Sequence, residues 1–275
     1  MSEHLSTTSA RPDARGISVT ARGAVRVIAF ARPERRNGMD LAMFRAYYDA
    51  LAEADADPAV RAVVITGEGG SFCSGATPGL LAELTGATAQ EELLAALGHP
   101  PHLPLTLRKP LIAAINGSAA GLGLVHALYA DIRFMAEGAQ LSTVFSRFGL
   151  IAEYGAAWLL PRLIGVPHAL DLLLSARPVD TAEALRIGLV QRTAPRQEVL
   201  AQAVEYAEQL AEGCSPASLA VIRHQVWGGL DTDCATAAAE SVTLMSESFR
   251  RPDFPEAMTA LRERRKPAFR PLPAD

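Results

Sequence analysis

The stretch Lys109-Pro-Leu-Ile-Ala-Ala-Ile-Asn-Gly-Ser-Ala-Ala-Gly-Leu-Gly123 joins a short apolar run to a cluster of small residues. Its segment Leu111–Ile115 has the composition of a strand that is buried on both faces, as in a parallel sheet. Asn116 and Gly117 then predict a turn, and a helix is expected over residues 122–130. The stretch therefore predicts an α/β architecture with parallel strands.

The sequence on both sides continues this alternation of strand and helix. Strands are predicted at residues 24–30 and 60–66, and further short strands at 132–135 and near Leu141. Between the first two strands, a helix is predicted to begin after Asp40, which can act as its N-cap. The apolar positions of this helix recur at helical spacing: Leu41, Phe44, Tyr48 and Leu51.

Two other segments depart from the alternation. Residues 85–109 contain one short helical stretch followed by closely spaced glycine and proline, which predicts a mobile flap. After Pro161 the pattern is mainly helical, with a tail long enough to pack on a neighbouring subunit. The helices predicted there span residues 167–174, 181–187, 197–211, 217–227, 234–249 and 254–265.

Composition restricts the class of protein. Hydrophobic residues make up 49% of the 275 residues and charged residues 20%, which is ample for a buried core. The net charge of −4 disfavours nucleic acid and anionic membranes as partners. Three widely spaced cysteines give neither a disulfide framework nor a metal site. With no apolar signal core in residues 1–15 and no run of about 20 apolar residues, a cytoplasmic location is expected.

Four stretches in a fixed order resemble the signatures of the crotonase superfamily, which includes enoyl-CoA hydratases and enoyl-CoA isomerases. They extend over almost the whole chain, and the last helix through Phe269 is similar too. The stretches are Ala31-Arg-Pro-Glu-Arg-Arg-Asn37, Ile65-Thr-Gly-Glu-Gly-Gly-Ser-Phe-Cys-Ser-Gly-Ala76, the stretch from Lys109 to Gly123 with Ala130-Asp131-Ile132, and Leu159-Leu-Pro-Arg-Leu-Ile-Gly165 with Ala184-Leu-Arg-Ile-Gly-Leu-Val190.

The resemblance implies a fold and an assembly. The expected fold is an α/β crotonase spiral of ββα units over residues 16–210, preceded by a flexible tail at 1–15. Residues 211–275 would form a helical region that builds a homotrimer or a dimer of trimers. The substrate would be an acyl-CoA, with coenzyme A arriving as part of it, no tightly bound cofactor and no metal.

The resemblance also implies an oxyanion hole, in which two backbone N–H groups stabilise a thioester enolate. These donors would belong to Ala76 and Leu122, although relatives commonly have glycine at the second position and aspartate where this chain has Thr77. Without the resemblance, both glycine-rich segments read as ordinary turns. Contacts with the substrate or with CoA are expected from Ser74, Gly75, Thr77, Gly121, Arg35 and Lys266.

The catalytic carboxylate is the feature that separates the possible reactions. The positions of the two hydratase glutamates are Val125 and Phe145 here. A third position, Glu153 in Leu150-Ile-Ala-Glu-Tyr-Gly155, resembles the glutamate of peroxisomal-type Δ3,Δ2-enoyl-CoA isomerases. Apolar neighbours, including Phe148, Leu150, Ile151 and Trp158, predict a raised pKa for Glu153, and the expected acyl pocket consists of Val125, Phe145, Phe148 and Trp158.

The favoured hypothesis is therefore double-bond isomerisation with Glu153 as proton shuttle. Enoyl-CoA hydration and acyl-CoA binding without catalysis are the alternatives, and Glu153 also suits a purely structural place at a helix N-terminus. Other crotonase reactions, namely dehalogenation, hydrolysis and decarboxylation, stay open. A Rossmann enzyme fits poorly because Gly117, Gly121 and Gly123 do not form G-x-G-x-x-G, and Ser118 lacks the frame of a hydrolase nucleophile. His126 is interpreted as a core or interface residue, and His102 as part of the proline-rich loop.

Overall fold

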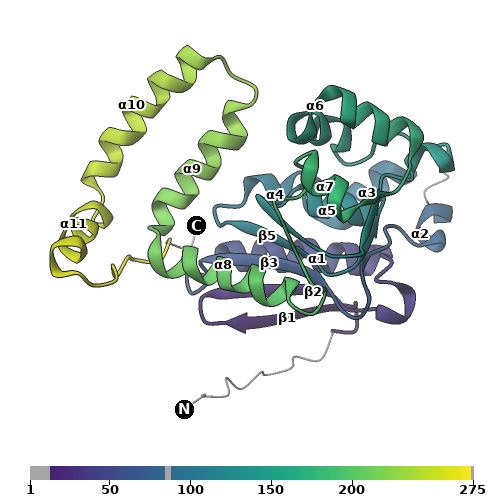
Figure 1. Cartoon of the computed structure of the whole chain (residues 1–275), viewed down its shortest axis with the longest axis horizontal. Helices are drawn as coiled ribbons and strands as arrows, with labels where there is room; N and C mark the ends of the chain where they lie inside the picture. The colour runs from purple at the N-terminus through teal and green to yellow at the C-terminus, as the bar shows by residue number, and fades with distance from the viewer. Residues whose placement is uncertain (1–12, 84–87, 274–275) are drawn as a thin grey trace.

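The apolar run Leu111–Ile115 is strand β5, in the middle of a six-stranded sheet (Figure 1). The computed structural model describes residues 13–83 and 88–273. The strand order is β1-β2-β3-β5-β7-β10, in which only the β1–β2 pair is antiparallel. The other strands of this sheet are β1 (Ile17–Arg22), β2 (Val25–Phe30), β3 (Ala62–Gly67), β7 (Ile132–Ala136) and β10 (Arg192–Ala194).

The chain also forms a second sheet of four short strands. Its order is β4-β6-β8-β9, with β4, β6 and β8 parallel. Three successive windings each place one strand in the first sheet and the next strand in the second: β3 is followed by β4, β5 by β6 and β7 by β8. The strands are β4 (Ser71–Cys73), β6 (Ser118–Ala120), β8 (Gln140–Ser142) and β9 (Val179–Asp180). This arrangement confirms the predicted spiral of ββα units.

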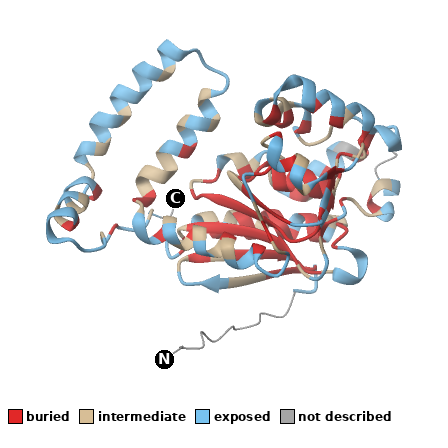
Figure 2. Ribbon diagram, in the orientation of Figure 1, coloured by how far each residue is buried: buried red, intermediate tan, exposed pale blue. Residues whose placement is uncertain are grey.

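Helices cover the first sheet and leave its central strands buried (Figure 2). Helix α1 (Leu41–Ala56) begins as predicted, because the Asp40 carboxylate accepts a hydrogen bond of 2.9 Å from the Met43 N–H. Helices α5 (Leu122–Leu128), α7 (Thr181–Arg186) and α8 (Val199–Gly213) also lie close to their predicted ranges. His126 of α5 is fully buried among aromatic rings, so its interpretation as a core residue is confirmed.

The segment predicted to be a flap contains helix α3 (Ala89–Leu97) and the short helix α4 (Leu103–Thr106). Gly98 ends α3 in a left-handed conformation with φ of 70°, which glycine adopts without strain. A further short helix, α2 (Pro78–Glu83), precedes it. Residues 84–87, where the predicted flap begins, lie outside the described residues, and mobility of the flap stays a prediction.

Helix α6 (Ala156–Ser175) is interrupted by a kink at Gly165, whose φ of 77° and ψ of 157° are not helical, and the part after the kink contains the helix predicted over residues 167–174. Among the described helices, α6 alone is long and apolar enough to cross a membrane. This is weak evidence, since core helices of globular proteins pass the same test. The helix follows the 3₁₀ turn η2 (Phe145–Phe148) and buries Leu159, Leu160 and Ile164 against the core.

Helices α9 (Pro216–Gly229), α10 (Cys234–Arg250) and α11 (Asp253–Glu263) form an arm that extends from the body (Figure 1). No residue of α10 is buried, and its Val242 side chain is 69% exposed. The arm begins after α8 ends at Gly213, so the predicted boundary at residue 210 falls inside a helix. The predicted tail at residues 1–15 lies outside the described residues up to residue 12.

Candidate active site

The loop after β4 presents the backbone N–H of Ala76. Met39 N–H donates to Gly75 O at 2.8 Å, and Thr77 N–H donates to Met39 O at 2.9 Å. This bridge uses the residues on either side of Ala76, and no hydrogen bond within residues 13–83 and 88–273 uses the Ala76 N–H itself. The loop therefore leaves one backbone donor available at the position expected for the oxyanion hole.

The second expected donor lies at the start of α5. Leu122 is the first residue of this helix, where the N–H has no acceptor inside the helix. Its conformation is helical and φ is not positive, so a side chain with a Cβ fits there without strain. The preceding Gly121, with φ of 51° and ψ of −125°, takes the conformation that needs glycine. The departure from glycine at Leu122 is therefore compatible with a backbone donor at this position.

The two donors come from segments that touch. A Cβ built on Gly75 would lie 3.3 Å from the Leu122 nitrogen and 2.7 Å from Ala120 O, so only glycine permits this approach. Ala76 and Leu122 both line a cavity of about 610 Å³. The structure thus brings together the two residues predicted to hold an oxyanion.

Glu153 lies on the same cavity, in the loop between η2 and α6. It is the one carboxylate among the described residues that line the cavity. Its side chain has no hydrogen bond or ion pair in the described part of the chain, and burial raises its pKa above the usual 4.5. Aliphatic side chains also line the cavity: Leu80, Leu81, Leu94, Leu150 and Ile151. The site therefore combines two backbone donors with one carboxylate that resists ionisation.

A tyrosine holds the loop that carries Glu153. The Tyr129 hydroxyl donates to Tyr154 O at 2.6 Å, and burial raises the pKa of Tyr129 to about 12, which keeps it a donor. Tyr154 and Gly155 have successive positive φ values of 45° and 77°. Tyr154 also packs edge-on against Phe44 of α1, at 5.4 Å between ring centroids. These contacts fix a strained turn immediately after the carboxylate.

Sequence reasoning missed Tyr129 and set His102 aside as a loop residue. Tyr129 lies two helical turns after Leu122, and that spacing places it on the same face as the oxyanion-hole residue. His102 lies at the start of α4 and lines the cavity together with Glu153. No local pattern in the proline-rich segment indicated that His102 would line the same cavity as Glu153.

The expected CoA contacts divide into two groups. Arg35, Ser74 and Thr77 line a neighbouring cavity of about 510 Å³ that shares Ala76 and Leu80 with the first, while Gly75 and Gly121 lie in the donor loops. Thr77 also caps α2, because its hydroxyl accepts from the Leu80 N–H at 3.2 Å. Lys266 lies elsewhere: it is 80% exposed and pairs with Glu212 at 2.6 Å. One chain alone does not bring Lys266 to this site.

The four residues predicted to form the acyl pocket do not come together. Val125 and Phe145 are buried in the hydrophobic core, so the hydratase carboxylate positions carry packed apolar side chains. Phe148 is 67% exposed, and Trp158 lines a different cavity. The reason is that η2 turns the Phe148 side chain outward, and α6 carries Trp158 past the Glu153 loop. Of the apolar neighbours expected for Glu153, Leu150 and Ile151 line its cavity.

Comparisons with known proteins identify the family of the chain. The family model described as enoyl-CoA hydratase/isomerase matches residues 20–271. A Mycobacterium bovis protein named probable enoyl-CoA hydratase echA12 is 36% identical over 88% of both chains. A probable enoyl-CoA hydratase/isomerase from Mycobacterium abscessus has a TM-score of 0.87 at 32% identity, covering 93% of this chain and 99% of the other. An enoyl-CoA hydratase from Bacillus anthracis has the same TM-score and coverage at 28% identity.

Strand order, motif order and these likenesses lead to one assignment. The chain belongs to the enoyl-CoA hydratase/isomerase family of the crotonase superfamily.

Proposed function

We propose that this enzyme moves a double bond, converting a 3-enoyl-CoA into the conjugated 2-enoyl-CoA, with Glu153 as the proton shuttle. The observation that supports this reaction is that a single carboxylate of the described residues lines the cavity. Glu153 lies there beside the Ala76 and Leu122 donors, while Val125 and Phe145 occupy the hydratase positions. A 1,3-proton shift needs only one group that removes and returns a proton.

The reaction takes place in two steps that balance in atoms and charge. The Glu153 carboxylate removes a proton from C2, and the C–H electron pair moves into the thioester to give a dienolate. Negative charge on the thioester oxygen is stabilised by the N–H groups of Ala76 and Leu122. The protonated Glu153 then delivers its proton to C4, the thioester C=O re-forms, and the new double bond lies between C2 and C3.

The environment of Glu153 suits both steps. Burial raises its pKa, which makes the carboxylate a stronger base than an exposed glutamate. With no ion pair holding it in the described structure, its charge is not neutralised by a neighbouring cation. The Tyr129 hydrogen bond to Tyr154 O fixes the loop, so the carboxylate is positioned before the substrate binds.

Hydration of a 2-enoyl-CoA is the second candidate, because the relatives are named enoyl-CoA hydratases. Hydration requires deprotonation of water and protonation of C2, which family hydratases divide between two glutamates. In this cavity, His102 is the side chain that could act as the second acid–base group beside Glu153. A His102→Gln variant therefore discriminates: it should lose hydration and keep isomerisation.

Substrate binding and assembly follow from the same proposal. The cavity that contains Arg35, Ser74 and Thr77 would receive the CoA moiety, with Arg35 available to its phosphates. A homotrimer built through the arm is supported by exposed apolar side chains on α10 and α11, including Met245, Phe249 and Leu261.

The test compares wild type with Glu153→Gln, which keeps the side-chain size and removes the base. Wild type should isomerise 3-hexenoyl-CoA faster than it hydrates crotonyl-CoA. The variant should lose at least about 1,000-fold in kcat, a loss in keeping with removal of a general base, while its affinity for hexanoyl-CoA is unchanged. Full isomerisation by Glu153→Gln would contradict the proposal, and intact binding by an inactive wild type would favour the non-catalytic alternative.

A further inference from the structure

Three cavities lie in a row through the site and share lining residues. The cavity with Arg35 shares Ala76 and Leu80 with the reaction cavity. The reaction cavity shares His102, Tyr129 and Gly155 with a third cavity of about 680 Å³. The cavity with Arg35 would receive CoA, and the third cavity meets the reaction cavity at a different set of residues.

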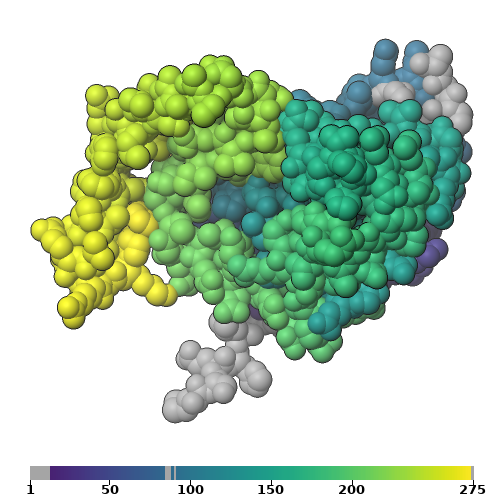
Figure 3. All heavy atoms as spheres, turned by 45° about the horizontal axis from the view of Figure 1, so that its top comes forward, coloured from purple at the N-terminus to yellow at the C-terminus, as the bar shows by residue number. Residues whose placement is uncertain are grey.

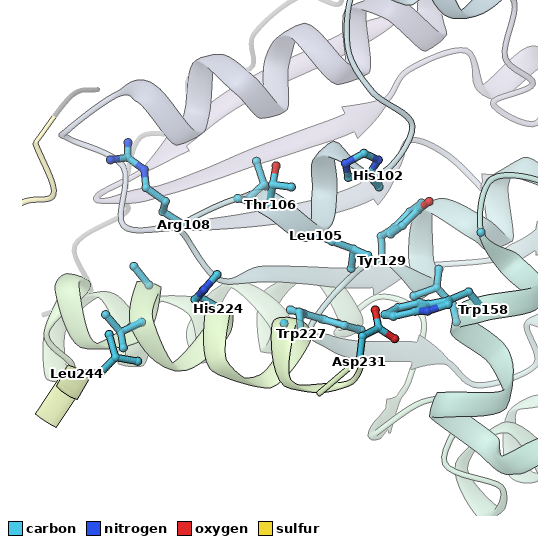
Figure 4. Close-up of a pocket in the computed structure, with 16 residues that line it drawn as sticks. His102, Leu105, Thr106, Arg108, Tyr129, Trp158, His224, Trp227, Asp231 and Leu244 are labelled. Carbon is cyan, nitrogen blue, oxygen red and sulfur yellow. The ribbon is translucent and has the colours of Figure 1, made fainter. Parts of the chain in front are cut away.

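The third cavity lies between the core and the arm, and two tryptophans line it (Figure 4). Trp158 comes from α6 and Trp227 from α9, with ring centroids 6.4 Å apart and planes tilted by 33°. Tyr129 adds a third ring where the cavity meets the reaction site. In Figure 3, atoms of an earlier, blue segment are visible at the bottom of a hollow between the light green and teal helices. The result is a broad aromatic wall.

Polar contacts hold both tryptophans in place. The Trp227 indole N–H donates to Asp131 Oδ1 at 2.9 Å, and Asp131 also pairs with the buried Arg223 at 2.9 Å. The Arg162 guanidinium lies over the Trp158 ring at 4.1 Å from its centroid and pairs with Asp231 at 3.0 Å. Because these side chains are already ordered, a ligand would not have to fix them on binding.

From this geometry we infer that the third cavity binds the distal part of the acyl group, and that this part carries an aromatic ring. The inference rests on the proposed acyl-CoA function. With CoA on the Arg35 side and the thioester at Ala76 and Leu122, an acyl chain longer than the reaction cavity leads past Tyr129 and Gly155 toward Trp158.

The chemistry of the wall favours a ring over a flexible chain. Aromatic faces attract the edge or the offset face of another ring beyond what buried area alone provides. A planar ring also loses less conformational entropy on binding than a linear chain of the same carbon count. Thr106 and His224 also line the cavity, so a polar substituent on the ring would meet hydrogen-bonding partners.

The experiment measures dissociation constants of saturated acyl-CoA thioesters, which lack the double bond needed for turnover. Butanoyl-CoA probes the thioester site alone, while decanoyl-CoA and 4-phenylbutanoyl-CoA have equal numbers of acyl carbons. We expect 4-phenylbutanoyl-CoA to bind about 10- to 100-fold more tightly than butanoyl-CoA, because a phenyl ring is buried. It should also bind about three- to tenfold more tightly than decanoyl-CoA.

Trp158→Leu should remove the preference for the ring over the decanoyl chain and leave butanoyl-CoA binding unchanged. Leu174→Ala, on the same helix α6 but 72% exposed and outside the three cavities, is the matched control and should keep the preference. Equal affinities for the two ten-carbon acyl groups in wild type, or an unchanged preference in Trp158→Leu, would overturn the ring subsite while butanoyl-CoA still binds. Failure of butanoyl-CoA itself to bind would instead overturn the proposed function on which the subsite rests.

Discussion

Lowering the pH from 6.5 to 5 should destabilise the folded chain by about 2 kcal/mol through one residue, His126. The imidazole is fully buried, and neither ring nitrogen has a hydrogen-bond partner within residues 13–83 and 88–273. Aromatic side chains surround it, with Tyr47 at 4.6 Å and Phe44 at 5.4 Å between ring centroids. Burial lowers the pKa of His126 from 6.5 to about 3.

The sign follows from which state binds the proton. Between pH 6.5 and pH 3, His126 is protonated in the unfolded chain and neutral in the folded one. Unfolding therefore takes up a proton, and stability falls as the pH falls, by about 1.4 kcal/mol per pH unit. The stability is fully present above pH 6.5, and about 5 kcal/mol would be lost by pH 3.

The assay is urea unfolding at pH 7 and pH 5 for wild type and His126→Leu. The leucine variant lacks the titrating ring, so its loss between the two pH values should be smaller than that of wild type by about 2 kcal/mol. It also removes two unpaired buried nitrogens, which cost about 1–3 kcal/mol when left without partners. Parallel pH dependence in the two proteins would refute the reasoning, because it would mean that His126 does not differ in protonation between the folded and unfolded states.

Three further predictions concern the active site. Tyr129→Phe removes the hydrogen bond that holds the Glu153 loop, so steady-state kinetics should show kcat lower by about two- to tenfold with little change in the melting temperature; an unchanged kcat would mean that the bond has no positioning role. Gly123→Ala places a Cβ 2.2 Å from Cys73 O, and thermal unfolding should show a loss of at least about 1–3 kcal/mol together with loss of turnover; wild-type stability would contradict this packing. Because Glu153 must be ionised to act as base, kcat/KM should fall as the pH drops through its raised pKa, above 4.5; a profile that stays flat down to pH 4 would argue against Glu153 as the base.

The sequence predicted the fold well because its decisive elements are local. The apolar run Leu111–Ile115, the cap at Asp40 and the turn at Gly117 each determine backbone conformation within a few residues. The donors at Ala76 and Leu122 were found for the same reason, since each belongs to a short glycine-containing motif. What the motifs could not show is that Gly121, and not Leu122, takes the conformation that needs glycine, so Leu122 is compatible with the missing glycine.

The predicted acyl pocket depends on contacts between distant segments, which the sequence does not show. Position relative to the catalytic motifs suggested Phe148, but η2 turns it toward solvent. The cavity beside Trp158 is instead completed by Trp227 from the arm, 69 residues later along the chain. The contact between the two tryptophans depends on the ion pair of Arg223 with Asp131, and the spacing of apolar residues in the sequence does not indicate that pair.

The most direct test of the central claim follows the transferred proton. When 3-hexenoyl-CoA, unlabelled at C2, is incubated with wild type in D₂O, NMR of the first product should show 2-hexenoyl-CoA with less than one deuterium at C4. This result is expected because a single buried Glu153 returns part of the proton that it removed from C2. Complete deuteration at C4 with an undiminished rate in Glu153→Gln, or release of only a 3-hydroxyacyl-CoA, would contradict the one-carboxylate shuttle.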